Sequence, residues 1–174
     1  SPAAWRAAST ATCSRIPRIW DSYELPDEFV VICDYVEGET LAVRMRAAGH
    51  FSEVRAVRIA LDVCEAAAAL HACGVVHRDI TPNNVVLAAD GAHLVDLGIA
   101  RVHGEHDLRD TTTLGTWGFA APEQFGFTQT DERSDVYAIG CLLGYMLTGI
   151  MPGTKEYVQA LEMMRSYQAC SPTW

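Results

Sequence analysis

The chain has 174 residues, of which 49% are hydrophobic and 20% are charged, and this balance indicates a folded globular protein rather than a disordered one. Its length fits one domain that can bury a core without disulfide or metal crosslinks. Thirteen Lys and Arg against 22 Asp and Glu give a formal net charge of −9. We therefore expect no nucleic-acid partner and no contact with an anionic membrane surface, because both need a basic face.

The six cysteines are scattered and form no C-x-x-C pair, which predicts free thiols in the reducing cytoplasm. Residues 1–14 are Ala-rich but interrupted by Arg6, and no apolar run of a secretory signal follows. The uncharged stretch 136–154 contains several glycines and Pro152, so we interpret it as a buried helix rather than a membrane span.

The first half of the chain predicts strands followed by helices. Residues 1–14 show no periodicity, so residues 1–15 are left unassigned. The β-rich runs 16–23 and 29–35 flank Leu-Pro-Asp-Glu and predict two strands around a turn. A short helix is expected over 40–48, and Ser52 is a good N-cap for a long helix that stops at Gly74. The apolar residues at helical spacing in that helix are Val54, Val57, Leu61, Cys64 and Ala68.

Residues 85–95 predict a β-hairpin, since Asp90-Gly91 separates two short apolar runs. Residues 99–121 have few apolar anchors and predict a long loop. Ser134 or Asp135 is expected to cap an apolar helix over 136–147, and 156–167 predicts another helix. With strands first and helices dominant after residue 50, the fold class is α+β.

The hairpin brings chemistry-bearing residues together. Asn84 lies six positions before Asp90 and Asp96 six positions after it, so both are expected at the open end of the hairpin. An amide oxygen and a carboxylate suit Mg²⁺, which keeps waters and phosphate oxygens as its other ligands. Asp79, five residues before Asn84, can face the same point as a proton acceptor. A base beside a two-ligand metal site is what phosphoryl transfer requires.

These residues resemble the motifs of protein kinases, and the order of the motifs is the family's order. We identify the chain by this resemblance as a bacterial serine/threonine protein kinase domain, cut at both ends, with partial N-lobe strands and a mainly helical C-lobe over 16–174. The motifs are His77-Arg78-Asp79-Ile80-Thr81-Pro82-Asn83-Asn84 for H-R-D-L-x-x-x-N, Asp96-Leu97-Gly98 for D-F-G, Ala121-Pro122-Glu123 for A-P-E, the helix start 134–140, and the strand and hinge 31–36.

The resemblance implies specific roles around ATP and Mg²⁺. Asp79 would accept the proton of a Ser or Thr hydroxyl of a protein substrate, while Asn84 and Asp96 would hold Mg²⁺. Asp135 would brace the backbone of the catalytic loop. The adenine site would comprise Cys33 at the gatekeeper position, the backbone of Asp34 and Val36, and Val86 beneath the ring.

Two further residues in the catalytic loop have implied roles. Arg78 would pair with a phosphorylated residue among Thr111, Thr112 and Thr113. Thr81 stands where these kinases usually carry a lysine that contacts the γ-phosphate.

Several of these residues also have plainer interpretations. His77 by itself would be a core histidine, Asp79 a turn residue and Asp135 a helix cap. Cys33 by itself would be a small hydrophobic residue. The cluster His103-Gly104-Glu105-His106-Asp107 resembles a metal site, but polar loops often collect histidines, so we favour a solvated loop.

The chain departs from the family before its hinge. Its first glycine is Gly38 and its only lysine is Lys155, so it contains neither a Gly-rich phosphate loop nor a strand lysine with its helix glutamate partner. We therefore expect impaired transfer by this chain. The alternatives are a non-catalytic pseudokinase or nucleotide-binding scaffold, and a small-molecule phosphotransferase, which is less favoured because such enzymes lack an activation segment closed by A-P-E.

Overall fold

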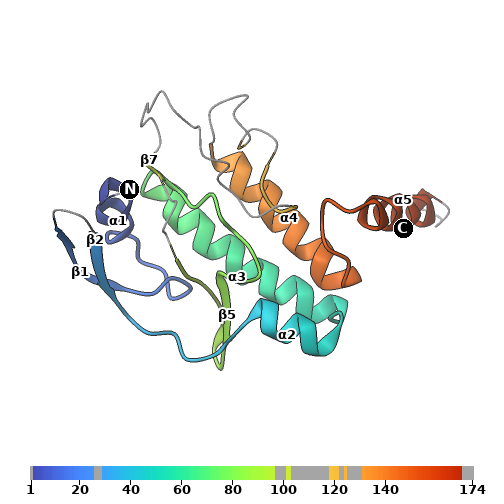
Figure 1. Ribbon diagram of the computed structural model, residues 1–174, viewed down its shortest axis with the longest axis horizontal. Helices are drawn as coiled ribbons and strands as arrows, with labels where there is room; N and C mark the ends of the chain where they lie inside the picture. The colour runs from blue at the N-terminus through green and yellow to red at the C-terminus, as the bar shows by residue number, and fades with distance from the viewer. Residues whose placement is uncertain are drawn as a thin grey trace.

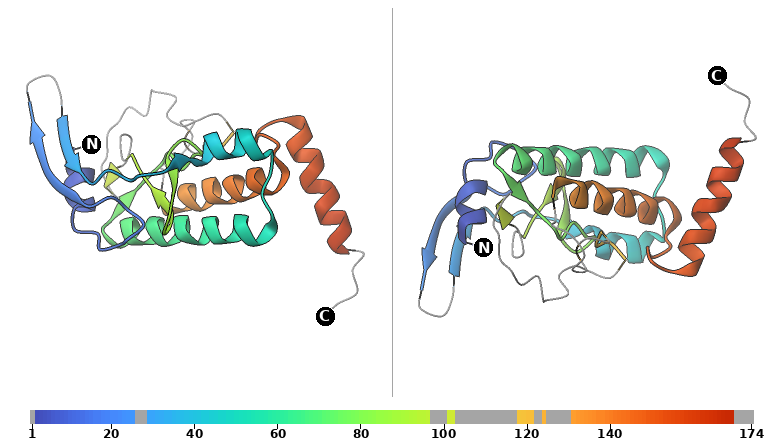
Figure 2. Two further views of the ribbon diagram at one scale, coloured as in Figure 1. Left: turned by 90° about the horizontal axis from the view of Figure 1, so that it is seen from below. Right: turned by 90° about the horizontal axis from the view of Figure 1, so that it is seen from above.

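The computed structural model describes residues 2–25, 29–96, 101–102, 118–121, 124 and 131–169. They form an α+β fold in which a two-stranded sheet lies at one end, the last helix at the other, and three helices lie side by side between them (Figures 1 and 2). The elements are α1 (Pro2–Ala8), β1 (Ile19–Glu24), β2 (Phe29–Cys33), β3 (Glu39–Thr40), α2 (Leu41–Ala48), α3 (Glu53–Ala72), β4 (Val75–Val76), β5 (Val85–Ala88), β6 (Gly91–Leu94), β7 (Arg101–Val102), α4 (Glu132–Thr148) and α5 (Lys155–Ala169).

The two strands expected before the hinge are confirmed. β1 and β2 pair antiparallel, with Ile19 opposite Cys33 and Glu24 opposite Phe29. The end of β2 therefore leads directly into the predicted hinge.

Residues 1–14 carry no periodic pattern, yet the structure has helix α1 there. Ala4 and Ala8 of this helix are buried in the core. A helix of seven residues is too short to be stable alone or to show a clear pattern, so its packing supports it. Helix α1 therefore depends on its packing against the rest of the protein rather than on a local sequence signal.

The helices expected over 40–48 and after Ser52 are confirmed, although the Ser52 side chain makes no capping hydrogen bond. Thr40 caps α2, because its hydroxyl accepts a hydrogen bond from the Val43 N–H at 3.3 Å. α3 begins directly after Ser52 and ends before Gly74. The prediction for α4 is wrong: Asp131, not Ser134 or Asp135, is its N-cap, and accepts from the Arg133 N–H at 2.8 Å. Asp135 lies inside the helix, and its carboxylate accepts hydrogen bonds from the His77 and Arg78 N–H groups instead of capping α4.

The apolar spacing in α3 predicts the helix correctly but does not mark its buried face. Val54 and Leu61 are 74% and 62% exposed, and Val57, Cys64 and Ala68 are exposed as well. The opposite face forms the core, because its small residues let α3 approach α4 and β6 closely. Its members are Ala56, Ile59, Ala60, Val63, Ala66, Ala67 and Leu70.

The hairpin is confirmed, but its register is one residue away from the expected symmetry about Asp90: Ala89 and Asp90 form the turn, and Asn84 pairs with Val95 rather than with Asp96. β5 and β6 pair with Val85 opposite Leu94 and Ala88 opposite Gly91, and β3 extends this sheet on the β5 side. The predicted loop 99–121 is interrupted by β7, which pairs antiparallel with β4. A two-residue strand has no periodicity of its own, so only its pairing partner reveals it.

Arg15 attaches the hairpin tip to α3. Its Nη1 donates to the Asp90 carbonyl oxygen at 2.8 Å, and its Nε lies 3.3 Å from Asp62 Oδ1. Asp62 in turn accepts from the Ala92 N–H at 2.9 Å. Gly91 lies at φ +138°, and an added Cβ would be 2.4 Å from Arg15 Nη1 and 2.7 Å from Asp62 Oδ2. This close approach requires glycine.

We predict that Gly91→Ala lowers the free energy of unfolding by about 1–3 kcal/mol, through backbone strain and displacement of the Arg15–Asp62 pair. Gly140→Ala is the matched control, because Gly140 lies in α4 with open space around its Cα. There we expect a gain of about 0.5–1 kcal/mol from helix propensity. Urea denaturation followed by circular dichroism measures both; equal effects of the two substitutions would contradict the prediction.

Candidate active site

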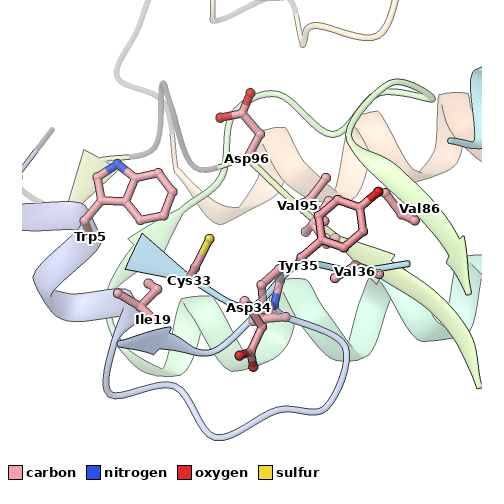
Figure 3. Close-up of a pocket in the computed structure, with 12 residues that line it drawn as sticks. Trp5, Ile19, Cys33, Asp34, Tyr35, Val36, Val86, Val95 and Asp96 are labelled. Atoms are coloured by element: carbon pink, nitrogen blue, oxygen red, sulfur yellow. The ribbon is translucent and has the colours of Figure 1, made fainter. Parts of the chain in front are cut away.

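A cavity of about 240 Å³ lies between the hinge, β6 and α1 (Figure 3). Five residues that the sequence analysis assigned to nucleotide or metal binding line it together: Cys33, Asp34, Val36, Val86 and Asp96. The other lining residues are Tyr35, which belongs to the expected hinge 31–36, and Trp5, Ile16, Pro17, Ile19, Leu94 and Val95, which sequence reasoning did not assign to the site. Most of these are apolar, so the cavity suits a flat, largely apolar ring.

The contribution of α1 to this cavity had no signal in the sequence. Figure 3 shows the Trp5 ring and the Cys33 sulfur turned toward the same space, on the side of β2 that faces Asp96. Trp5 reaches the cavity only because α1 packs beside β1.

The hinge residue Asp34 is held from outside the cavity. Its N–H donates to the Arg18 carbonyl oxygen at 3.0 Å, and its Oδ1 accepts from Trp20 Nε1 at 2.7 Å. The Arg18 guanidinium lies 4.0 Å above the Trp20 ring. The carboxylate of Asp34 thus points away from the cavity in Figure 3, and its backbone carbonyl, not its N–H, is left for a ligand.

The predicted base and a predicted metal ligand are in direct contact. Asn84 Nδ2 donates to Asp79 Oδ2 at 2.8 Å and to the Asp79 carbonyl oxygen at 2.9 Å. Both amide hydrogens are therefore used to hold Asp79, and Oδ1 remains as the ligand atom of Asn84. The Val95 N–H donates to the Asn84 carbonyl oxygen at 2.9 Å, which places Asp96 beside this end of the hairpin.

Asp96 lies on the exposed edge of the cavity in a left-handed conformation, with φ 62°. Asp and Asn tolerate this region better than most residues. Leu97 and Gly98, the rest of the D-L-G motif, lie outside the described residues.

His77 is fully buried and fixes the start of the catalytic loop. Its Nδ1 accepts from the Asp79 N–H at 3.3 Å, and its Nε2 lies 3.3 Å from the Val95 carbonyl oxygen. Burial lowers the pKa of His77. A neutral ring with the proton on Nε2 satisfies both contacts.

Asp135 is fully buried and braces the catalytic loop, as the resemblance implies. Its Oδ2 accepts from the His77 N–H at 2.9 Å and its Oδ1 from the Arg78 N–H at 2.8 Å. His71 Nε2 of α3 donates to Oδ2 at 2.7 Å. Three donors compensate the loss of water around the carboxylate.

Arg78 sits in a strained backbone conformation, with φ 70°, and is buried. Such a conformation in a residue other than glycine costs about 1–3 kcal/mol and persists only when its surroundings enforce it. The threonines expected to pair with Arg78 lie outside the described residues. Thr81, the position of the usual lysine, is buried, and its carbonyl oxygen accepts from the Asn84 N–H at 3.0 Å.

Gln124 also contacts the catalytic loop and had no signal in the sequence beyond its place after Ala121-Pro122-Glu123. It is buried, and its Nε2 donates to the Arg78 carbonyl oxygen at 2.7 Å. Its Oε1 accepts from the Ala121 N–H at 3.0 Å.

The described residues contain neither a metal-binding cluster nor a membrane-spanning helix. Within the part of the chain that the structure describes, no three His, Cys, Asp or Glu side chains gather as a metal-binding group. None of the described helices has the length and apolar character needed to cross a membrane. The cluster 103–107 lies outside the described residues.

Comparison with known proteins agrees with this geometry. Residues 6–172 match the family model of the protein kinase domain. The chain is 38% identical over 161 residues to the serine/threonine-protein kinase PknD of Mycobacterium tuberculosis, covering 90% of this chain and 24% of that protein. It is 37% identical over 136 residues to the serine/threonine-protein kinase PknH of Mycobacterium bovis, covering 77% and 23%. The third relative, PknB of M. tuberculosis, is 35% identical over 130 residues, covering 72% and 21%.

The chain therefore belongs to the protein kinase family. Within that family it is similar to bacterial serine/threonine kinases, and it spans about a quarter of the length of these curated relatives.

The ion pair between His71 and Asp135 gives a testable pH dependence. The hydrogen bond to Asp135 raises the pKa of His71, against the opposing effect of burial. A pKa raised in the folded state means that the stabilisation is complete below the unfolded pKa of about 6.5 and is lost as pH rises through the folded value. We expect His71→Gln to lower the free energy of unfolding by about 1.5–3 kcal/mol at pH 5.5 and by less at pH 8.5.

Urea denaturation of wild type and His71→Gln across this pH range measures the difference. Any contribution of His77 to the free energy of unfolding is present in both proteins, so it cancels in the difference between them. His50→Gln is the control, since His50 is exposed. If the difference in free energy of unfolding between wild type and His71→Gln does not change with pH, the ion pair between His71 and Asp135 is contradicted.

Proposed function

We propose that the site binds ATP with Mg²⁺ and transfers the γ-phosphate to a Ser or Thr hydroxyl of a protein. The observation that carries this proposal is the double hydrogen bond from Asn84 Nδ2 to Asp79, at 2.8 and 2.9 Å, next to Val95 of the apolar cavity, whose N–H donates to the Asn84 carbonyl oxygen. It fixes a carboxylate base beside an amide oxygen that can ligate a cation, and these are the two groups that phosphoryl transfer needs side by side.

The adenine ring would occupy the apolar cavity. Val86 from β5 and Leu94 from β6 would lie against the ring, and the backbone of Asp34 and Val36 would meet its polar edge. Cys33 and Trp5 would bound the inner end. Because Asp34 uses its N–H within the protein, its carbonyl oxygen would accept from the adenine amino group.

The residues present fit Mg²⁺. Asn84 Oδ1 and the Asp96 carboxylate are hard oxygen ligands at one end of the hairpin, and Mg²⁺ binds through one or two such groups together with phosphate oxygens and water. When bound, the ion would neutralise phosphate charge. Asp79 would accept the proton of the attacking hydroxyl, and Asn84 would keep its carboxylate in place.

A second candidate is a nucleotide-binding protein without transfer activity. The chain has no glycine before Gly38 and no lysine before Lys155, and α1 contains no carboxylate that could pair with such a lysine. The arginines described before the hinge make other contacts: Arg6 pairs with Glu24, Arg15 with Asp62, and Arg18 lies over Trp20. The intact Asp79, Asn84 and Asp96 favour catalysis.

Two further assignments are proposals. The free state of the described cysteines favours a reducing cytoplasmic location; they are Cys13, Cys33, Cys64, Cys73 and Cys141. The motifs place the start of the kinase domain at residue 16. The packing of α1 against the core and the family match from residue 6 favour an earlier boundary.

We predict that Mg²⁺ strengthens nucleotide binding through Asp96. Asp96→Asn should reduce the gain in ATP affinity on adding Mg²⁺ by about tenfold, roughly 1.4 kcal/mol, with little change in its absence. Asp34→Asn is the matched control, because Asp34 also lines the cavity but turns its carboxylate to Trp20. Titration calorimetry with and without Mg²⁺ measures both, and equal losses in the two variants would refute a metal role for Asp96.

We also predict that the 174-residue chain binds Mg-ATP weakly and transfers phosphate hardly at all. Positioning of the triphosphate supplies much of the rate, and each 1.36 kcal/mol lost is about a factor of ten. A longer chain with an upstream Gly-rich loop and lysine should regain transfer, and Asp79→Asn should abolish it. The assay is incorporation of radiolabelled phosphate. Robust transfer by the 174-residue chain that Asp79→Asn abolishes would show that the upstream parts are not needed.

A further inference from the structure

We propose that Gln124 is a positioning residue that couples residues 118–121 to the catalytic loop by holding the peptide that joins Arg78 to Asp79. The inference rests on the proposed function, because it assigns Asp79 as the base. It concerns how that base is held in place and which segment can move it.

The Arg78 residue is fixed from both sides. Its N–H donates to Asp135 Oδ1 at 2.8 Å, and its carbonyl oxygen accepts from Gln124 Nε2 at 2.7 Å. All three residues are at least 97% buried, so water does not readily replace either bond. With φ at 70°, Arg78 tends to relax toward ordinary backbone angles unless both of its peptide groups are held.

The peptide that Gln124 holds is also the peptide of Asp79. The Arg78 carbonyl and the Asp79 N–H belong to one planar group, and that N–H donates to His77 Nδ1 at 3.3 Å. Rotation of this plane would break the contact with His77 and move the Asp79 carboxylate away from Asn84. Gln124 therefore acts on the base through the backbone, without touching the substrate.

The other end of Gln124 holds the segment 118–121. The Gln124 Oε1 accepts from the Ala121 N–H at 3.0 Å, and the backbone N–H of Gln124 donates to the Ala121 carbonyl oxygen at 2.9 Å. Phe119 of this segment is buried edge-on against the Tyr145 ring of α4, with centroids 6.0 Å apart. A shift of 118–121 is thus transmitted to the Arg78 carbonyl through one side chain.

A glutamine is required because the position needs a donor and an acceptor at once. A glutamate keeps the acceptor for Ala121 but, when ionised, cannot donate to a carbonyl oxygen. A methionine of similar length fills the space and supplies neither strong donor nor strong acceptor. These two substitutions separate hydrogen bonding from packing.

The test is amide hydrogen exchange of the 174-residue chain, resolved by NMR and expressed as protection factors to remove the intrinsic pH effect. In Gln124→Met we expect protection to fall at least tenfold at the amides of His77, Arg78 and Ala121 while α3 core amides, such as that of Val63, stay unchanged. In Gln124→Glu at pH 8, protection of Ala121 should persist while His77 and Arg78 lose theirs. Burial beside the Arg78 carbonyl oxygen favours the protonated carboxyl as the pH falls, so at pH 5 it can donate and protection of His77 and Arg78 should return.

Gln159→Met and Gln159→Glu are the matched controls, since Gln159 is exposed on α5. Unchanged protection of the catalytic loop in Gln124→Met, or an equal fall throughout α3, overturns the proposal. If Gln124→Met does not fold, the pH dependence of protection in Gln124→Glu relative to wild type at the same pH decides the outcome, because titration of the His71–Asp135 pair is common to both proteins and a packing role adds nothing to it. The readout needs no phosphate transfer, so the two proposals fail separately: absence of transfer by the longer chain with the Gly-rich loop and lysine would refute the proposed function, while the exchange result decides this inference.

Discussion

The carboxylate of Asp135 is the interaction on which the site depends. It is fully buried in α4 and accepts from two successive amides of the catalytic loop, His77 and Arg78, and from His71 of α3. A carboxylate without water stays stable only when donors surround it, so the loop and both helices must meet at this point. The strained backbone of Arg78 persists because this arrangement over-determines it.

The position of Asp79, the proposed base, follows from this contact in short steps. The loop leaves Arg78 into Asp79, and Asn84 reaches back to hold the Asp79 carboxylate before the chain enters β5. The hairpin then returns through β6 to Asp96. Arg15 fastens the other end of the hairpin to α3, so its open end is held by a rigid framework. In the proposed function, groups placed this way would need little reorganisation when a nucleotide binds.

The site is supported from several segments far apart in the sequence. The cavity joins α1, the hinge and the hairpin, and the catalytic loop is held from α3, α4 and Gln124. Changes in any of these segments can therefore reach the catalytic loop through direct contacts. A side chain such as Gln124, which holds two backbone groups at once, links such a change to the base without contacting it.

The sequence by itself determined the elements whose signals are local. Asp90-Gly91 set the hairpin and thereby brought Asn84 and Asp96 to one end, while glycines and caps set the limits of α2 and α3, and the ordered motifs indicated the family. Only the tertiary structure decided which face of α3 is buried, that α1 and β7 form, and that Trp5 and Gln124 reach the site. The reason is physical: turns and caps depend on neighbouring residues, whereas a buried face, a two-residue strand or a side-chain bridge depends on partners distant in the chain.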